Sequence, residues 1–202
     1  MVSAQGSKLN HIQGLRGLSV IMVCLYHLQF DYFSGGFIGV DVFMVISGYL
    51  ITTMILKQRQ GSSWSLADFY TRRCKRILPA LFVVIAFTFI AGILFFLPDQ
   101  LLRLTKSASF SFLSLQNFFL LSESGYFNLD SGLKPLLHIW SLSIEVQFYI
   151  IFPLIIIFLS YIGIEKGLKY VLILMLVISC VACYFMTGAN SDNAFYLLPF
   201  RF

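Results

Sequence analysis

GLRGLSVIMVCLYHL, residues 14–28, is an apolar stretch that carries two ionisable side chains, Arg16 and His27. An ionisable residue inside a membrane-spanning segment is energetically costly and therefore marks a candidate functional site. Eleven helical steps of about 100° return to within roughly 20° of the starting direction and advance about 16 Å. The two side chains therefore face the same way on one helix. A permanent cation lies near one membrane surface, and a titratable base lies about half a bilayer deeper.

The composition extends the membrane interpretation to the whole chain. Of 202 residues, 58% are hydrophobic and 11% are charged, and the mean hydropathy is +0.85. These values are not typical of a soluble domain. Because spanning helices satisfy their own backbone groups in lipid, we predict an all-α, polytopic transmembrane helical bundle. Most of the net charge of +5 lies in one short segment, which indicates membrane orientation and not a nucleic-acid partner.

Five apolar segments have the length that a bilayer requires. They are residues 16–33, 37–56, 77–97, 139–160 and 168–187. The run at 104–121 is more polar, and we expect a polar-lined span, a re-entrant segment or an interfacial helix there. The chain ends in AFYLLPFRF, which resembles the opening of another helix. We therefore expect one integral-membrane domain over residues 1–202 that is a fragment of a longer protein.

The positions of Lys and Arg predict the orientation of the spans, because short cytoplasmic loops are enriched in them. Residues 57–76 carry six of these cations, so this loop and the N-terminus are predicted to be cytoplasmic. Lys166 and Lys169 predict that the loop at 161–169 is cytoplasmic too. The segment 122–138 is then outside, and the run at 104–121 does not complete a crossing. The alternative is that this run does cross the membrane, in which case the loops at 122–138 and 161–169 both lie on the opposite sides.

The second span contains a carboxylate near its outer end, in GGFIGVDVFMVISGYLIT (residues 35–52). In this topology Asp41 lies at a depth that His27 can reach. A carboxylate beside an imidazole fixes its tautomer and stabilises the cation formed on protonation. The alternative is that Asp41 caps the start of its helix.

A basic cluster stands in FYTRRCKRILPAL, residues 69–81, and consists of Arg72, Arg73, Lys75 and Arg76. We predict that the following helix starts at Ile77, with Pro79 in its first turn. Guanidinium groups bind phosphates bidentately, and helix N-termini favour anions, so the cluster is a candidate phosphate site. The alternative is that these cations only anchor the chain at the cytoplasmic surface.

The segment LLHIWSLSIEVQFYIIFPL, residues 136–154, places polar side chains in a strongly apolar run. Ser141, Glu145 and Tyr149 are spaced by four residues and so share one helix face. A carboxylate inside a span rarely faces lipid. Glu145 is therefore a candidate site residue, and the alternative is a structural polar clamp between helices.

Together these four blocks resemble the acyltransferase family 3 membrane proteins, the bacterial surface-polysaccharide O-acetyltransferases. The family has an Arg, ten residues and a His in its first span, as Arg16 and His27 do here. Its RxxR is matched by Arg73 and Arg76, and its WSLSxExQFY by residues 140–149. Its second-span motif is matched at Gly35, Gly36, Gly39, Val40, Asp41, Phe43, Ser47, Gly48 and Tyr49.

The sequence departs from the family at two of these places. Met44 replaces a usual Phe, and Gln13 stands where the family often has Asp or Glu. Because of Gln13, a functional role for a carboxylate before the first span is in doubt. The Arg16–His27 pair is not affected. The sequence predicts five to six spans and the start of another. Family members have roughly ten spans, so the resemblance implies that the C-terminal spans are absent from this chain.

The resemblance implies a reaction. Acetyl-CoA, the acyl donor, binds from the cytoplasm, and a hydroxyl of a glycan or lipid-linked glycan accepts the acyl group outside a bacterial inner membrane. Candidate acceptors are lipopolysaccharide O-antigen, exopolysaccharide and peptidoglycan. No metal is implied, and the partners are acyl-CoA, the acceptor glycan and membrane lipid.

Each motif then has an expected role. Arg73 and Arg76, with Arg72 and Lys75, hold the phosphates of CoA, and Arg16 contacts the donor at the inner mouth. His27 is the general base or carries the acyl group transiently, with Asp41 or Glu145 orienting it. Two rival interpretations stay open: a transporter or flippase of an acyl or glycan intermediate, and an inactive fragment of the enzyme.

Overall fold

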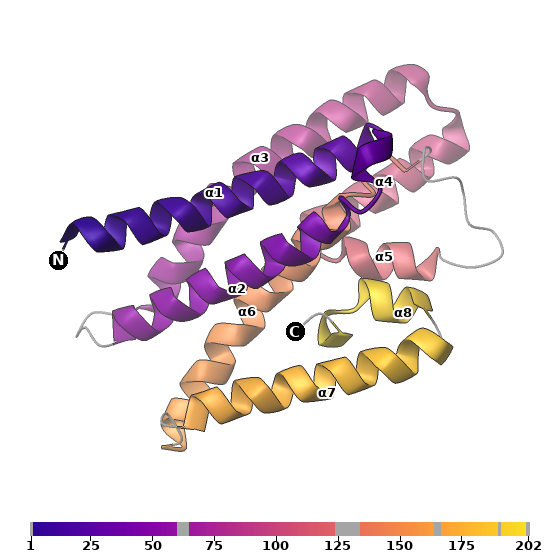
Figure 1. Cartoon of the computed structure of the whole chain (residues 1–202). Coiled ribbons are helices and arrows are strands. Elements are labelled where there is room, and N and C mark those ends of the chain that lie inside the picture. The colour runs from indigo at the N-terminus through magenta and orange to yellow at the C-terminus, as the bar shows by residue number, and fades with distance from the viewer. Residues whose placement is uncertain (1, 60–64, 124–133, 164–166, 190, 201–202) are drawn as a thin grey trace. The chain divides into compact units, whose positions relative to one another are not determined.

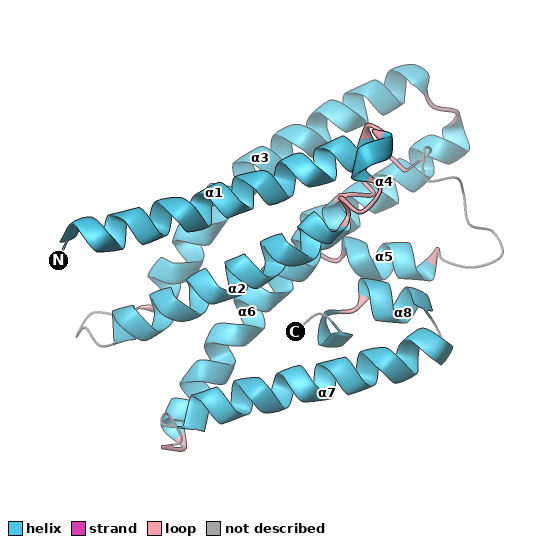
Figure 2. Cartoon of the chain, viewed as in Figure 1, coloured by secondary structure: helices cyan, strands magenta, loops and turns pink. Residues whose placement is uncertain are grey.

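The structure is a computed structural model that describes residues 2–59, 65–123, 134–163, 167–189 and 191–200. Within these residues every regular element is a helix (Figures 1 and 2), which confirms the all-α prediction. The elements are α1 (Val2–His27), η1 (Asp31–Phe33), α2 (Ile38–Arg59), α3 (Leu66–Phe95), α4 (Pro98–Phe112), α5 (Gln116–Ser122), α6 (Ile139–Tyr161), α7 (Leu168–Ala189), α8 (Ser191–Tyr196) and η4 (Leu198–Phe200).

Four helices in the described residues are long and apolar enough to cross a membrane. They are Ile38–Lys57 of α2 and the whole of α3, α6 and α7. The first predicted span lies in α1, but this helix ends at His27 and not at residue 33. The helix ends there because Gln29 has a φ of 56°, in the left-handed region, and the chain then enters η1.

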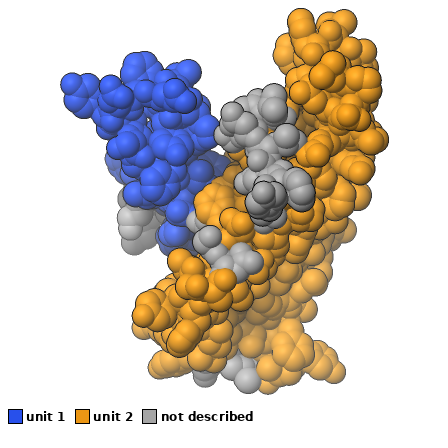
Figure 3. All heavy atoms as spheres, turned by 90° about the vertical axis from the view of Figure 1, so that its right-hand side faces the viewer, with its two compact units in different colours: residues 1–64 blue, residues 65–202 orange. Residues whose placement is uncertain are grey.

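The chain forms two compact units, Met1–Trp64 and Ser65–Phe202, which Figure 3 shows in separate colours. The first unit contains α1 and α2, and the second contains α3 to η4. The expectation of one integral-membrane domain over residues 1–202 stays a prediction.

In the first unit, α1 and α2 form an antiparallel hairpin with very close helix packing. A Cβ on Gly36 would collide with the carbonyl oxygen of Met22, and a Cβ on Gly39 would collide with that of Ser19. Later residues of α2 thus meet earlier residues of α1. Small residues allow such close backbone approach, which strengthens van der Waals packing between membrane helices.

In the second unit, α3 begins eleven residues earlier than predicted. Its first residue is Leu66 and not Ile77, because the Ser65 hydroxyl accepts a hydrogen bond from the Asp68 backbone N–H and caps the helix. Pro79 lies inside the helix instead of in its first turn. The basic cluster is therefore helical and does not precede a helix N-terminus.

The run at 104–121 is not one helix. It is divided between α4 and α5, and Ser114 between them has a φ of 57°. Neither helix is long enough to cross a bilayer. Whether the two helices together form a polar-lined span, a re-entrant segment or an interfacial segment stays a prediction.

The second unit has an apolar cluster around this segment. Its buried members, Leu81, Leu104, Leu136 and Ile139, come from α3, α4, the segment before α6, and α6. A Cβ on Gly92 of α3 would collide with the side chain of Leu104, so α4 also packs closely against α3. These contacts position the polar residues of α4 to α6 that are described below.

We expect Gly39→Ala to weaken the α1–α2 hairpin, although alanine favours a helix over glycine by about 1 kcal/mol. The new methyl group must displace the Ser19 backbone, and such overpacking costs about 1–3 kcal/mol. The measurement is the melting temperature of the purified protein in detergent. Gly35→Ala is the control, because nothing lies within 4 Å of a Cβ at that position. Equal melting temperatures for the two variants would contradict the packing described here.

Candidate functional site

Arg16 is buried against α2. The residue is 7% exposed, and its guanidinium carbon lies 4.5 Å from the centroid of the Phe43 ring. Within the described residues it contacts no carboxylate. A buried cation that no anion compensates is energetically costly. Its cost marks Arg16 as a candidate functional residue.

His27 lies in the last turn of α1, and its Nδ1 is 2.7 Å from the carbonyl oxygen of Val23. A carbonyl oxygen can only accept a hydrogen bond, so Nδ1 carries the proton in this contact. The neutral imidazole then has its lone pair on Nε2, which is the atom suited to take a proton. The backbone of α1 thus contributes to the orientation of the imidazole ring.

Asp41 is half-buried in the first turn of α2. His27 and Asp41 stand on either side of the short connection between α1 and α2, and so lie at the same end of the hairpin. The predicted helix-start role is consistent with this position, since a carboxylate in the first turn interacts favourably with the helix dipole. Whether Asp41 or Glu145 orients His27 stays a prediction.

The basic cluster divides into two parts because it is helical. Arg73 is half-buried, and its guanidinium carbon lies 5.1 Å from the centroid of Tyr149 and 5.6 Å from that of Phe69. Arg72, Lys75 and Arg76 are exposed. The helix N-terminus lies at Leu66, more than one turn before the cluster, so the helix dipole does not act at these cations.

The predicted face on α6 is confirmed for Glu145 and Tyr149. The Tyr149 hydroxyl donates a hydrogen bond to Glu145 Oε1, and Arg73 of α3 stacks on the same tyrosine ring. Ser141 instead donates to the carbonyl of His138 at 3.1 Å. Arg73 and Glu145, which the sequence proposed as separate sites, are thus joined through one aromatic side chain.

A buried polar network, which the sequence interpretation missed, surrounds the break between α4 and α5. Gln116 and Asn117 are both 0% exposed. The Gln116 N–H donates to Ser143 Oγ at 3.2 Å, and Gln147 Nε2 donates to the Ser114 carbonyl at 2.9 Å and to Asn117 Oδ1 at 2.8 Å. Side chains of α6 thereby satisfy backbone groups that the break releases from the helix.

The network continues from Gln116 and Asn117 to other elements. The Ser111 hydroxyl donates to Gln116 Oε1 at 3.1 Å, and Gln116 Nε2 donates to Ser107 Oγ at 2.8 Å. Asn117 Nδ2 donates to the Tyr196 carbonyl of α8 at 3.0 Å. Burial raises the pKa of Tyr196, as does the nearby Asp192, so its phenol stays neutral. The sequence shows these amides in an apolar run, but not their partners.

A family model described as an acyltransferase domain matches residues 9–202, which span both units. The chain belongs to this acyltransferase family. The four motifs in the sequence had predicted this membership.

The acyltransferase chain is also similar to curated proteins. It is 37% identical over 189 residues to "O-acetyltransferase OatA" of Staphylococcus aureus, which covers 89% of the chain. It is 38% identical over 190 residues to "Peptidoglycan O-acetyltransferase OatA" of Listeria monocytogenes, which covers 92% of the chain. These matches span only 30% of each OatA protein.

A third relative is closer in length. An uncharacterised protein of Haemophilus influenzae is 41% identical over 170 residues, which are 80% of this acyltransferase chain and 69% of the relative. No solved structure matches the chain.

We expect Ser111→Ala to destabilise the acyltransferase chain more than Ser109→Ala. Ser111 is 0% exposed, and its hydroxyl donates a hydrogen bond to Gln116 Oε1. Ser109 is exposed, and its hydroxyl donates to the Thr105 carbonyl of the same helix. Leaving a buried acceptor unsatisfied costs about 1–3 kcal/mol. Thermal unfolding in detergent measures the difference, and similar losses for both serines would show that the network contributes little to stability.

Proposed function

We propose that this chain acts in the transfer of an acetyl group from cytoplasmic acetyl-CoA to a hydroxyl of an extracytoplasmic glycan. The observation that carries the proposal is the buried Arg16, on the same continuous helix as His27, in a member of the acyltransferase family. The names of the two OatA relatives favour acetyl as the acyl group, and that of the Listeria relative favours peptidoglycan as the acceptor.

The donor would bind at the N-terminal end of α3, which the positive-inside rule places in the cytoplasm. Arg72, Lys75 and Arg76 are exposed there, and in this proposal their side chains bind the phosphates of CoA. Arg73 has a different role in this proposal: it holds Tyr149 and so supports the Glu145 hydrogen bond. We expect donor affinity to depend on the exposed cations more than on Arg73.

His27 would act at the outer end of α1. Its Nε2 takes the proton of the acceptor hydroxyl while the hydroxyl oxygen attacks the thioester carbonyl, and the C–S bond breaks with release of CoA. The His27 imidazolium then gives that proton to the CoA thiolate, which leaves the ester on the glycan and a neutral imidazole. Arg16, about 16 Å away along the same helix, contacts the donor in this proposal. Transient acylation of His27 is the alternative route.

A transporter or flippase would use similar buried Arg, His and Glu residues. The two functions differ in chemistry, because only the transferase breaks the thioester. Release of CoA from acetyl-CoA by the protein in proteoliposomes therefore separates them. The partial coverage of the OatA relatives makes the same measurement informative about whether the 202-residue chain is active without other segments.

We expect His27→Gln and His27→Ala to reduce glycan acetylation in cells by about 100-fold or more, because general-base catalysis contributes at least that factor. The readout is ester-linked acetate released from the isolated glycan at matched protein levels. His11→Gln is the control, since His11 is exposed on the same helix. Full acetylation in both His27 variants would remove His27 from the reaction.

We expect Arg76→Glu combined with Lys75→Glu to weaken acetyl-CoA binding roughly tenfold or more, because charge-assisted hydrogen bonds to phosphate are lost. Isothermal titration of the purified protein measures the dissociation constant. Lys169→Glu is the matched control, because Lys169 is an exposed cation on the same predicted membrane side. An unchanged dissociation constant in the double variant would leave the cluster with membrane anchoring alone.

A further inference from the structure

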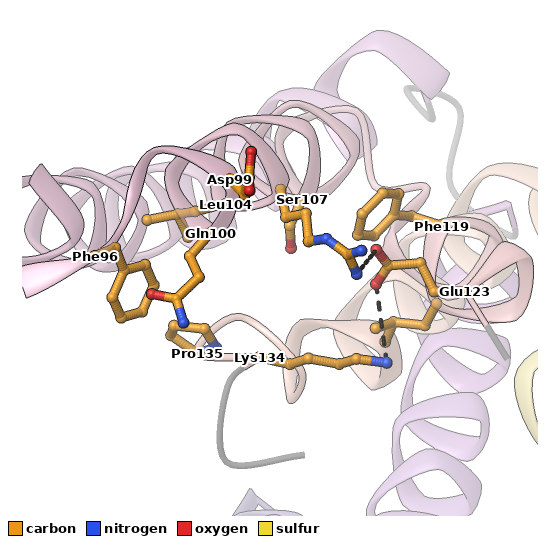
Figure 4. Close-up of a pocket in the computed structure, with 11 residues that line it drawn as sticks. Phe96, Asp99, Gln100, Leu104, Ser107, Phe119, Glu123, Lys134 and Pro135 are labelled. Carbon is orange, nitrogen blue, oxygen red and sulfur yellow. Dashed lines mark ion pairs between the residues drawn. The ribbon is translucent and has the colours of Figure 1, made fainter. Parts of the chain in front are cut away.

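The second unit contains a pocket of about 200 Å³ where α3 turns into α4 (Figure 4). Phe96 and the first turns of α4 form one side, and α5 with the segment that leads into α6 forms the other. None of the residues assigned to the reaction above lines it. Its polar wall includes Asp99, Gln100, Arg103, Ser107, Glu123 and Lys134.

Glu123 lies between the two cations of the pocket. One carboxylate oxygen is 3.8 Å from Arg103 Nη1 and the other is 3.8 Å from Lys134 Nζ. Both distances exceed hydrogen-bond length, so the carboxylate offsets the charges while its oxygens can still accept from a ligand hydroxyl. The Glu123 side chain is 21% exposed, and that of Lys134 is 12% exposed. The Arg103 side chain is 51% exposed, so Glu123 and Lys134 are the more covered members of this group.

The charges of the lining balance. Arg103 and Lys134 are offset by Asp99 and Glu123, so the pocket has no formal net charge. A phosphate or carboxylate ligand would gain nothing overall from such a lining. An uncharged ligand with several hydroxyl groups matches it better, because carboxylates and amides accept from hydroxyls while Arg and Lys donate to them.

The remaining lining is apolar. Figure 4 shows the Phe96 and Phe119 rings on opposite sides of the pocket, with Pro135 on the wall below. The ligand must therefore be amphipathic. A sugar ring has hydroxyl groups at its edge and C–H groups on its faces, and so suits both kinds of wall. The volume is smaller than the roughly 300–1,000 Å³ of sites for drug-sized ligands, which indicates one ring and not a chain.

The position of the pocket agrees with an acceptor site. α3 continues unbroken from Arg73 to Phe95, and Phe96 follows directly. This helical length is about 33 Å, close to the roughly 30 Å of a bilayer core. The pocket and the basic cluster thus lie near opposite membrane surfaces. Since the cluster is predicted to be cytoplasmic, the pocket is on the extracytoplasmic side.

We infer that this pocket binds one uncharged sugar ring of the acceptor glycan. The inference depends on the proposed function for the identity of the ligand as acceptor, but not for the chemistry of the pocket. Glu123 and Asp99 accept from the sugar hydroxyls, Arg103 donates to them, and Phe96 and Phe119 contact the C–H faces.

The test is saturation-transfer NMR on the purified full-length protein in detergent, with N-acetylglucosamine as the probe. We expect transfer to the ring protons and at least tenfold weaker binding in Glu123→Gln and in Asp99→Ala. The second variant covers the case in which Glu123→Gln folds poorly, since Asp99 is exposed. Lys106→Ala is the control: an exposed cation on α4 that does not line the pocket.

Three outcomes would overturn the inference. They are equal transfer to acyclic sorbitol, displacement of the sugar by inorganic phosphate, and unchanged sugar affinity in both pocket variants. Pocket variants should keep wild-type acetyl-CoA affinity, and His27→Gln should keep sugar binding. Loss of the His27 effect with sugar binding intact would reject the proposed function alone, whereas absence of sugar binding with the His27 effect intact would reject the pocket alone.

Discussion

The hydrogen bonds of Gln116 and Gln147 allow the chain to break its helix between α4 and α5. Non-helical backbone at membrane depth is tolerated only where protein groups satisfy it. Here the Ser114 carbonyl accepts from Gln147, and the Gln116 N–H donates to Ser143. Because both partners lie on α6, the break is joined to the most buried of the long helices.

The break has a direct consequence for the pocket. α5 starts at Gln116, so the polar network determines where Phe119 and Glu123 stand relative to α4. Glu123 can then lie between Arg103 and Lys134, which are far from it along the chain. A continuous helix over this run would carry Glu123 away from Arg103 and Lys134. The arrangement of charges at this end of α3 thus depends on amides buried in the interior of the second unit.

In the first unit, the close packing of two helices buries a charged side chain. Close packing at Gly36 and Gly39 brings α2 against α1, and Arg16 is covered by Phe43 as a result. The aromatic face stabilises the guanidinium, but it does not neutralise its charge. Arg16 therefore remains a buried cation able to attract an anionic group, and His27 lies further along the same helix.

Much of this protein was determined by the sequence alone. The length of the apolar segments, together with the cost of unpaired backbone groups in lipid, predicted the all-α fold and the four long helices that can cross a membrane. The spacing of four residues predicted that Glu145 and Tyr149 share a helix face, where they form a hydrogen bond. Helix limits were less predictable: Ser65 starts α3 well before Ile77, and Gln29 ends α1 early. Only the tertiary structure decided that Arg73 stacks on Tyr149, that Gln116 and Gln147 join α4 and α5 to α6, and that Glu123 meets two cations. These contacts join residues distant in sequence, and helical periodicity specifies the face of a residue but not the partner that packs against it.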